Sequence, residues 1–213
     1  MDGGGFLTQG GYGCVYHPEV TCKGKDTQNT NFLSKIVERD YNSDNEIAIG
    51  QILKKKMKNW LEMPLENYFA PVVSHCDVDV DKFQMEDKEK CDLFEKYRHS
   101  DFVLLKIRYI GGGEIDNFIM QNTNNSLIML MFTSSYTHML KSLQMLLNVK
   151  ICHFDIKAAN IVYDKDKSMP IIVDFGLSIN FDKINMKKSF FMESTKYYIW
   201  PLEVHLLNHI LHV

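Results

Sequence analysis

The chain has 213 residues, of which 45% are hydrophobic and 24% charged, and its formal net charge is −3. Such a chain can bury a hydrophobic core, either as one domain or as two small lobes that share a cleft. This charge gives no reason to expect a nucleic acid or an anionic membrane as a partner. No apolar run approaches the ~20 residues that cross a bilayer, and the first residues lack the basic and apolar regions of a secretory signal.

The cysteines are expected to be reduced thiols. They are Cys14, Cys22, Cys76, Cys91 and Cys152. Their number is odd, no Cys-x-x-Cys pair occurs, and their spacing is irregular. This pattern favours an intracellular, cytoplasmic protein over a disulfide framework or a zinc site.

The first part of the chain is predicted to be rich in β-strands. Apolar runs at 6–7 and 14–16 flank a glycine cluster, and a third run follows at 32–37 after a polar turn region. β-formers separated by Gly, Asn, Asp and Thr are typical of hairpins. A helix with an apolar stripe is expected next, and Ser43 or Asp44 can cap it.

Two more strands of the first part are expected at 69–76 and 102–110, and they enclose a charge-dense surface insertion at 77–100. A glycine break follows at 111–113, and the part of the chain after it is predicted to be mainly helical. A long apolar helix is expected at 126–149. Two short strands are expected further on, at 161–163 and 171–173. This order of elements predicts an α+β fold.

A glycine-rich stretch lies between the first two apolar runs. Gly10, Gly11 and Gly13 precede Val15. Glycines in such a turn let backbone N–H groups approach phosphate oxygens closely, because no Cβ intervenes. No Gly-Lys-Ser/Thr follows, which excludes a Walker A loop, and the stretch alone could be an ordinary turn.

The segment 153–160 carries the strongest chemical signal. Asp155 can accept a hydroxyl proton, Lys157 can neutralise a transferring phosphate, and the amide oxygen of Asn160 can bind Mg²⁺. Asp174 comes 14 residues after Asn160, directly behind an apolar run and two residues before a glycine, which suits a metal ligand on a hinge. Either motif alone is equally well explained as a polar turn, but their order and spacing together argue against that explanation.

With these motifs the chain resembles the eukaryotic-type protein kinase superfamily, of the serine/threonine type, along nearly its whole length. The resemblance implies a two-lobed α+β fold, with residues 1–110 as the N-lobe and 111–213 as a C-lobe. It also implies an enzyme that uses ATP and Mg²⁺ to phosphorylate a serine or threonine of a protein substrate.

The resemblance assigns roles to individual residues. The catalytic set is Asp155 as base, Lys157 as γ-phosphate contact, Lys35 as contact to the α- and β-phosphates, and Glu46 as its ion-pair partner. The implied Mg²⁺ ligands are Asn160 and Asp174. The implied nucleotide-binding residues are Gly10, Gly11, Gly13, Val15, Lys35, Ile107, Tyr109, Ile110, Glu114 and Val162. Lys157 favours serine/threonine over tyrosine specificity.

The chain departs from the family pattern in several places. Thr8 stands where the first loop glycine belongs, and Phe154 replaces the arginine before the base, so activity is not expected to require phosphorylation of 177–199. Residues 200–203 resemble the Ala-Pro-Glu motif, after which family domains continue for several helices. We therefore expect a truncated C-lobe; marginal folding, a partner chain that covers it, and a split or truncated reading frame are the alternatives.

Three functions are compatible with these residues. The first is the serine/threonine kinase, the second a catalytically impaired nucleotide-binding pseudokinase or scaffold, and the third a small-molecule kinase of related fold. The stretch around Gly13, together with Cys22 shortly after it, also resembles kinases encoded by large DNA viruses. This resemblance would place the protein in the host cytoplasm or the virion.

Overall fold

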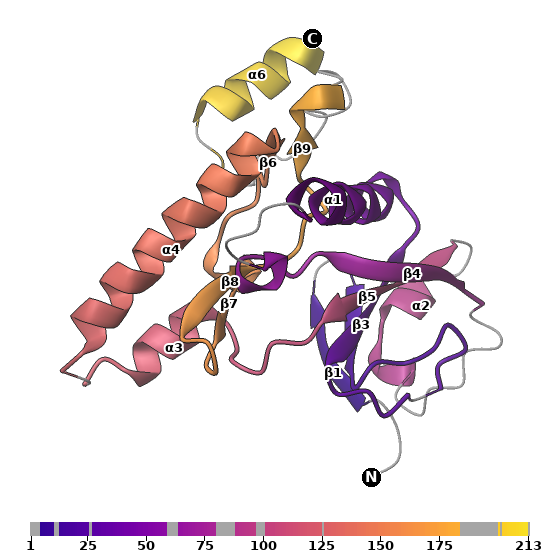
Figure 1. The fold of residues 1–213 in the computed structure, drawn as a ribbon. Helices are drawn as coiled ribbons and strands as arrows, with labels where there is room; N and C mark the ends of the chain where they lie inside the picture. The colour runs from indigo at the N-terminus through magenta and orange to yellow at the C-terminus, as the bar shows by residue number, and fades with distance from the viewer. Residues whose placement is uncertain are drawn as a thin grey trace.

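The computed structural model describes residues 5–10, 13–25, 27–58, 64–79, 88–96, 101–124, 126–183, 200 and 202–212. A β-rich first part is followed by a mainly helical second part, so the predicted α+β fold is confirmed (Figure 1).

The first part is built on a five-stranded antiparallel sheet in the order β1-β2-β3-β5-β4. Its strands are β1 (Gly5–Gly10), β2 (Gly13–His17), β3 (Phe32–Glu38), β4 (Val72–Val78) and β5 (Phe102–Arg108). Successive side chains of a strand point to opposite faces, and β5 is buried on both. Phe102 and Leu104 pack into a cluster on one face, whereas Val103, Leu105 and Ile107 belong to a second cluster on the other.

Helix α1 (Tyr41–Met57) lies against the second face of the sheet (Figure 1). Its cap is Asp40, and not Ser43 or Asp44 as predicted. The Asp40 carboxylate accepts a hydrogen bond from the Ser43 amide at 2.8 Å, and the Ser43 hydroxyl accepts one from the Asp40 amide at 2.9 Å. Both residues are good cap formers, and Ser43 takes the third helical position of this capping box instead.

Glycine at position 50 allows α1 to approach β4 closely. A Cβ atom at this position would lie 2.7 Å from the carbonyl oxygen of Val72. On either side of Gly50, Ile49 and Leu53 pack into a third cluster with Phe175 and Leu146. The helix therefore joins the sheet to the second part of the chain.

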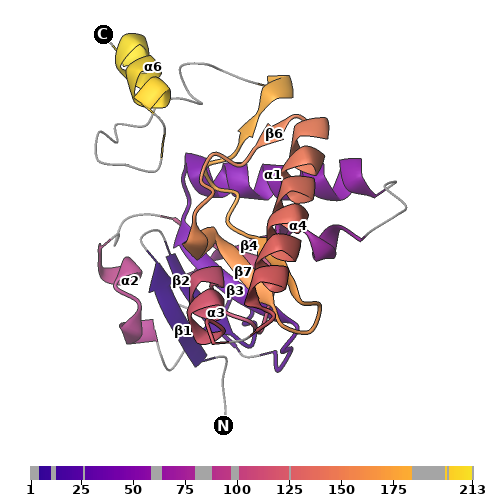
Figure 2. The ribbon, with the colours of Figure 1, turned by 90° about the vertical axis from the view of Figure 1, so that its left-hand side faces the viewer.

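The second part contains two short β-ribbons, in which β7 pairs with β8 and β6 with β9, and η3 and α2 belong to the connection between β4 and β5. The bounds of the remaining elements are η1 (Leu65–Asn67), η3 (Lys88–Lys90), α2 (Leu93–Lys96), α3 (Ile115–Gln121), α4 (Ile128–Asn148), β6 (Ile151–Cys152), η4 (Ala158–Asn160), β7 (Ile161–Asp164), β8 (Met169–Ile172), β9 (Ile179–Asn180), η5 (Phe181–Lys183) and α6 (Leu202–His212). Helix α4 runs along β8, while α6 stands apart from the sheet in both views (Figures 1 and 2).

Helix α4 exposes most of its apolar side chains. Of its 21 residues only Ser135, Ser142 and Leu146 are buried. The exposed apolar residues of α4 are Met129, Leu130, Phe132, Tyr136, Leu140, Leu143 and Leu147. None of the helices among the described residues has the length and apolarity needed to cross a membrane.

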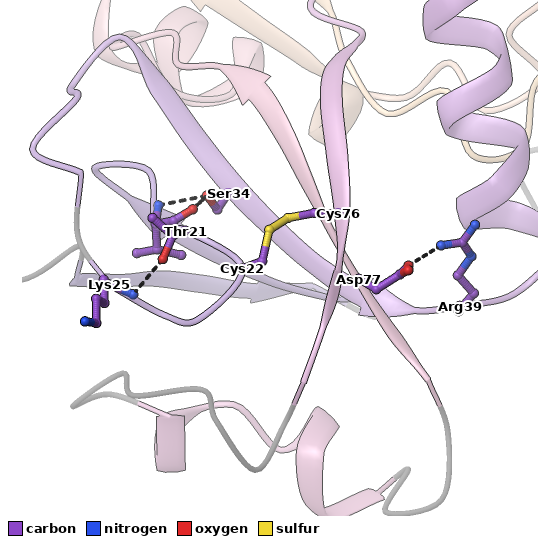
Figure 3. The surroundings of a disulfide bond; sticks show 8 residues. Thr21, Cys22, Lys25, Ser34, Arg39, Cys76 and Asp77 are labelled. Carbon is purple, nitrogen blue, oxygen red and sulfur yellow. Dashed lines mark hydrogen bonds and ion pairs between the residues drawn. A yellow bond between two sulfur atoms is a disulfide. The ribbon is translucent and has the colours of Figure 1, made fainter.

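Four cysteines form two disulfides, which corrects the prediction of reduced thiols. Cys14 is bonded to Cys91, and Cys22 to Cys76 (Figure 3), while Cys152 is a free thiol. The partners are 77 and 54 residues apart in the chain, so only the tertiary structure brings them together. Disulfides persist mainly in oxidising surroundings, so the cysteine pattern no longer supports a cytoplasmic location.

Candidate active site

A cavity of about 200 Å³ lies between β3, α1 and the residues that follow β8. Lys35, Glu46, Asp155 and Asp174 all line it. These four residues come from a strand, a helix and two loops, and they were singled out from sequence motifs. The fold therefore gathers most of the expected catalytic side chains around one space.

Lys35 is the centre of a chain of ion pairs. Its Nζ lies 3.1 Å from Glu46 Oε2 and 3.1 Å from Asp174 Oδ1. Strand β3 directs Lys35 toward α1, whose buried side carries Glu46. Asp174 follows β8 in a left-handed backbone conformation, with φ of 62°. The ion pair that the resemblance implies between Lys35 and Glu46 is thus present in the structure.

The side chains of Lys35, Glu46 and Asp174 shift one another's pKa values. Burial by itself lowers the pKa of Lys35, but the two carboxylates outweigh it, and the pKa is raised above its ordinary value. Burial also acts to raise the pKa of Asp174, but the Lys35 ammonium outweighs it, and the pKa is lowered. Burial raises the pKa of Glu46, and Lys35 opposes that rise. Lys35 and Asp174 are therefore both charged at neutral pH.

Asp155 is held by two neighbours on its own loop. The amide nitrogen of Asn160 donates to Asp155 Oδ2 at 2.8 Å and to the Asp155 carbonyl oxygen at 2.9 Å. Lys157 Nζ lies 3.0 Å from the same carboxylate oxygen. The short helix η4 brings Asn160 back beneath Asp155 and makes these contacts local. Asp155 is consequently buried but lines the cavity.

His153 positions this loop, a role that the motif analysis did not assign. Its Nε2 donates to the Val173 carbonyl oxygen at 3.0 Å, and its Nδ1 accepts from the Asp155 amide at 3.3 Å. This arrangement requires the neutral ring, and burial indeed lowers the pKa of His153. A histidine two residues before the aspartate was the only signal for this contact in the sequence.

Asn45 is a second residue that the motifs did not reveal. From α1 its side chain donates to the carbonyl oxygens of Gly176 and Ser178, at 2.9 and 2.7 Å. These bonds tie the segment after Asp174 to the same helix that carries Glu46. An asparagine beside the expected ion-pair residue was visible, but its partners are more than 130 residues away.

Phe154, which replaces the usual arginine, is contacted by Trp200. The two ring centroids are 5.0 Å apart, and the indole N–H donates to the Phe154 carbonyl oxygen at 2.8 Å. An aromatic contact thus occupies this side of the loop. Of the activation segment, which is residues 177–199 in the family pattern, residues 184–199 lie outside the described residues, as does Pro201.

The residues expected to face adenine also lie close together. Ile107, Ile110 and Val162 share one apolar cluster with Leu33. Val15 pairs with Lys35 in the sheet, and Glu114 forms a β-bridge with Val162. The Tyr109 amide donates to the Asn31 carbonyl oxygen at 2.9 Å, and its ring stacks on His17 at 3.6 Å.

The glycine-rich hairpin is described except for its tip. Gly10 and Gly13 form the last pair of β1 and β2, and Gly11 lies outside the described residues. A Cβ atom on Gly13 would lie 2.6 Å from both the Ile36 carbonyl oxygen and the Val37 side chain. Glycine is therefore required at position 13 by the packing of the sheet.

The donor set suits Mg²⁺. Asp174 is partly exposed, and the two bonds from the Asn160 amide nitrogen leave its amide oxygen as the atom for a metal. Mg²⁺ prefers oxygen ligands, and in kinases one or two protein ligands suffice because substrate phosphates supply others. Within the described part of the chain no cluster of three or more His, Cys, Asp or Glu residues could hold a metal.

A family model described as a protein kinase domain matches residues 39–204, which is most of the chain. The match begins directly after β3, so the glycine-rich hairpin and Lys35 lie outside it and are linked to the site by the geometry above. No curated protein matches the chain.

Proposed function

Because the chain belongs to the protein kinase family, we propose that it transfers the γ-phosphate of ATP to a serine or threonine hydroxyl of a protein. The observation that carries this proposal is the cavity in which Asp155 and the chain of ion pairs Glu46–Lys35–Asp174 meet. A protein that only bound a partner would not need these charges buried around one space, since burying charged groups is costly.

Each charged residue has a proposed task. Lys35, held by Glu46, contacts the α- and β-phosphates, and Lys157 contacts the γ-phosphate. Asp155 orients the attacking hydroxyl and accepts its proton, and the hydrogen bond from the Asn160 side chain to Asp155 Oδ2 fixes the carboxylate for this task. Asn160 and Asp174 are the proposed Mg²⁺ ligands; when bound, the metal neutralises negative charge on the phosphates.

The adenosine end is proposed to lie between the two parts of the chain, residues 1–110 and 111–213. Gly10, Gly11 and Gly13 would cover the phosphates. Val15, Ile107, Ile110 and Val162 would enclose the base, with backbone groups around Tyr109 facing it and Glu114 close to the ribose. The shared apolar cluster of Ile107, Ile110 and Val162 supports this placement.

Activity is proposed to be independent of phosphorylation. Phe154 cannot bind a phosphate as arginine does, and its contact with Trp200 supplies another way to hold the end of the activation segment. Treatment with a phosphatase is expected to leave the rate of transfer unchanged, measured before and after treatment on the same sample.

The exposed apolar face of α4 is proposed to be covered by another protein surface. Contiguous exposed apolar side chains of this kind are typical of protein–protein contacts. Light scattering over a range of concentrations tests this idea, because Leu140→Ser and Leu143→Ser together should lower the apparent mass of any assembly. The proposal would be contradicted if wild type and the double variant both keep the mass of a monomer and bind no added protein.

The deciding experiment is transfer of radiolabelled phosphate from Mg·ATP to a generic basic protein. Wild type is expected to transfer label, whereas Asp155→Asn and Asp174→Ala are not. The exposed residue Asp166, changed to Ala, is the matched control and should keep full activity. Asp155→Asn should still bind nucleotide. A folded wild type that binds ATP without transferring phosphate would instead indicate a nucleotide-binding pseudokinase.

A further inference from the structure

Part of the insertion between β4 and β5 packs on the outer face of the sheet. This segment, residues 88–96, comprises η3 and α2 and lies beside β1 and β2 (Figure 2). Leu93 and Phe94 belong to the cluster that contains Tyr16 and Ile36. The Phe94 ring also meets Phe102 of β5 edge to face, with centroids 5.3 Å apart. The segment is thus a packed part of the fold.

The same segment reaches the active-site cavity. The Asp92 amide donates to the side-chain oxygen of Gln9 on β1 at 3.1 Å, close to the glycine-rich hairpin. The next residue, Leu93, lines the cavity together with Lys35, Asp155 and Asp174. Leu93 is the one contribution of the insertion to the described lining of this cavity.

The Cys14–Cys91 disulfide links the 88–96 segment to β2. Cys91 is bonded to Cys14, which directly follows Gly13 on β2 and is completely buried. Only one residue separates Cys91 from Leu93. The bond therefore ties the turn end of the glycine-rich hairpin to the segment whose Leu93 lines the cavity.

We propose that Leu93 is a positioning residue for the triphosphate of ATP, and that the Cys14–Cys91 disulfide holds it in place. An apolar side chain at this end of the cleft excludes water, and charges such as that of Lys35 interact more strongly where water is excluded. This inference rests on the proposed function. It concerns the phosphate end of the cleft, since the apolar cluster expected to face adenine does not include Leu93.

A dithiol is the reagent that opens the bond. One of its thiolates attacks a sulfur of the Cys14–Cys91 disulfide, and its second thiolate then closes the dithiol into its own cyclic disulfide. Two electrons and two protons pass to the protein, which leaves two cysteine thiols. Opening the bond frees the 88–96 segment from the hairpin, and we expect the triphosphate to bind more weakly.

The second disulfide is a matched control. Cys22–Cys76 joins the loop after β2 to β4, the edge strand at the opposite end of the sheet from β1 (Figure 3). Neither of its cysteines lines the cavity. Removing this bond should affect stability without changing triphosphate binding.

The experiment compares the affinities of Mg·ATP and of adenosine, which has no phosphates, by titration calorimetry. Leu93→Ala and the double variant Cys14→Ser/Cys91→Ser should each weaken Mg·ATP binding about tenfold and adenosine binding less than about twofold. Leu93→Met should restore most of the Mg·ATP affinity. Cys22→Ser/Cys76→Ser should match wild type. Cys14 and Cys91 are buried, so dithiothreitol is added while the protein refolds. Wild type refolded in this way should bind Mg·ATP more weakly than oxidised wild type, whereas the Cys14→Ser/Cys91→Ser variant should lose no further affinity.

Several results would overturn the inference. Equal losses for Mg·ATP and adenosine would reduce Leu93 to a structural core residue, as would unchanged affinities in Leu93→Ala. Alkylation of Cys14 and Cys91 in the folded, unreduced protein, read by mass spectrometry, would show that no bond holds the segment. If the double cysteine variant does not fold, the Leu93→Ala and Leu93→Met pair still decides. Failure of unreduced wild type to bind either ligand would refute the proposed function itself.

Discussion

Helices α1 and α4 differ in how far the fold buries their apolar residues. α1 has 17 residues, many of them polar, and it buries Ile49 and Leu53 almost completely. α4 has 21 residues and is richer in Leu, Met and Phe, but Leu146 is its one buried large apolar residue. An apolar sequence therefore did not predict burial here.

The difference comes from the number of neighbours that each helix has. α1 lies between β4, which it approaches at Gly50, and the segment 174–178, to which Asn45 donates two hydrogen bonds. α4 runs along β8 and stacks His138 on Tyr68, and just after its last residue Lys56 of α1 donates to the Val149 carbonyl oxygen at 3.0 Å. Specific contacts from two sides anchor a helix more firmly than apolar composition does.

The largest expected effect is on stability and separates the two helices directly. Leu53→Ala in α1 should lower the free energy of unfolding by about 3 kcal/mol, because it leaves a cavity in a fully buried cluster. Leu140→Ala in α4 removes a side chain that is 50% exposed and should cost less than about 0.5 kcal/mol. Urea unfolding of the two variants measures both values. The value for Leu140→Ala applies to the chain without a partner; equal losses would indicate that the proposed second protein surface already covers α4 in the sample.

A smaller effect is expected where α1 meets β4. Gly50→Ala should destabilise the protein by about 2 kcal/mol, because the new Cβ atom would clash with the Val72 carbonyl oxygen. Gly111→Ala is the control, since the nearest atom to its Cβ, Cε1 of Tyr109, lies at an ordinary contact distance of 3.9 Å. Thermal unfolding of both variants tests the prediction. A neutral Gly50→Ala would show that the close approach of α1 is not needed.

The smallest effect concerns pH and a contact of α4. His138 donates to the Asn67 carbonyl oxygen at 2.9 Å and stacks on Tyr68, and burial lowers its pKa below the ordinary 6.5. The unfolded chain then binds the proton more readily, so this contribution to stability is present above about pH 6.5 and is lost as the pH falls through the lowered pKa. Lys35 and Asp174, which anchor α1, stay charged over the same range.

Acidification from pH 7.5 to 5.5 should therefore weaken the attachment of α4 and leave the ion pairs of α1 intact. The loss in unfolding free energy should be smaller in His138→Phe than in wild type by about 0.5 kcal/mol. His153, whose pKa burial also lowers, is present in both proteins and contributes equally to each. If His138→Phe and wild type show the same pH dependence of the unfolding free energy, the contribution proposed for His138 is wrong.

The sequence by itself determined the local parts of the protein. The α+β class, the long helices and most strands followed from periodicity and turn residues, because these patterns reflect contacts within a few positions. The motif around Asp155 belongs to the same class, since Asn160 and Lys157 contact Asp155 within five residues of the chain. A fragment this short can be recognised because its geometry depends little on the rest of the fold.

Only the tertiary structure decided the distant pairings. It joined Cys14 to Cys91, brought Leu93 to the cavity, placed Asn45 on the segment after Asp174, and left the apolar face of α4 exposed. The spacing of residues along the sequence does not predict contacts between residues 77 or 131 positions apart, because these contacts depend on how the whole sheet and its helices pack. The cysteine prediction was wrong for this reason, whereas the motif residues Asp155 and Asp174 line one cavity with Lys35 and Glu46.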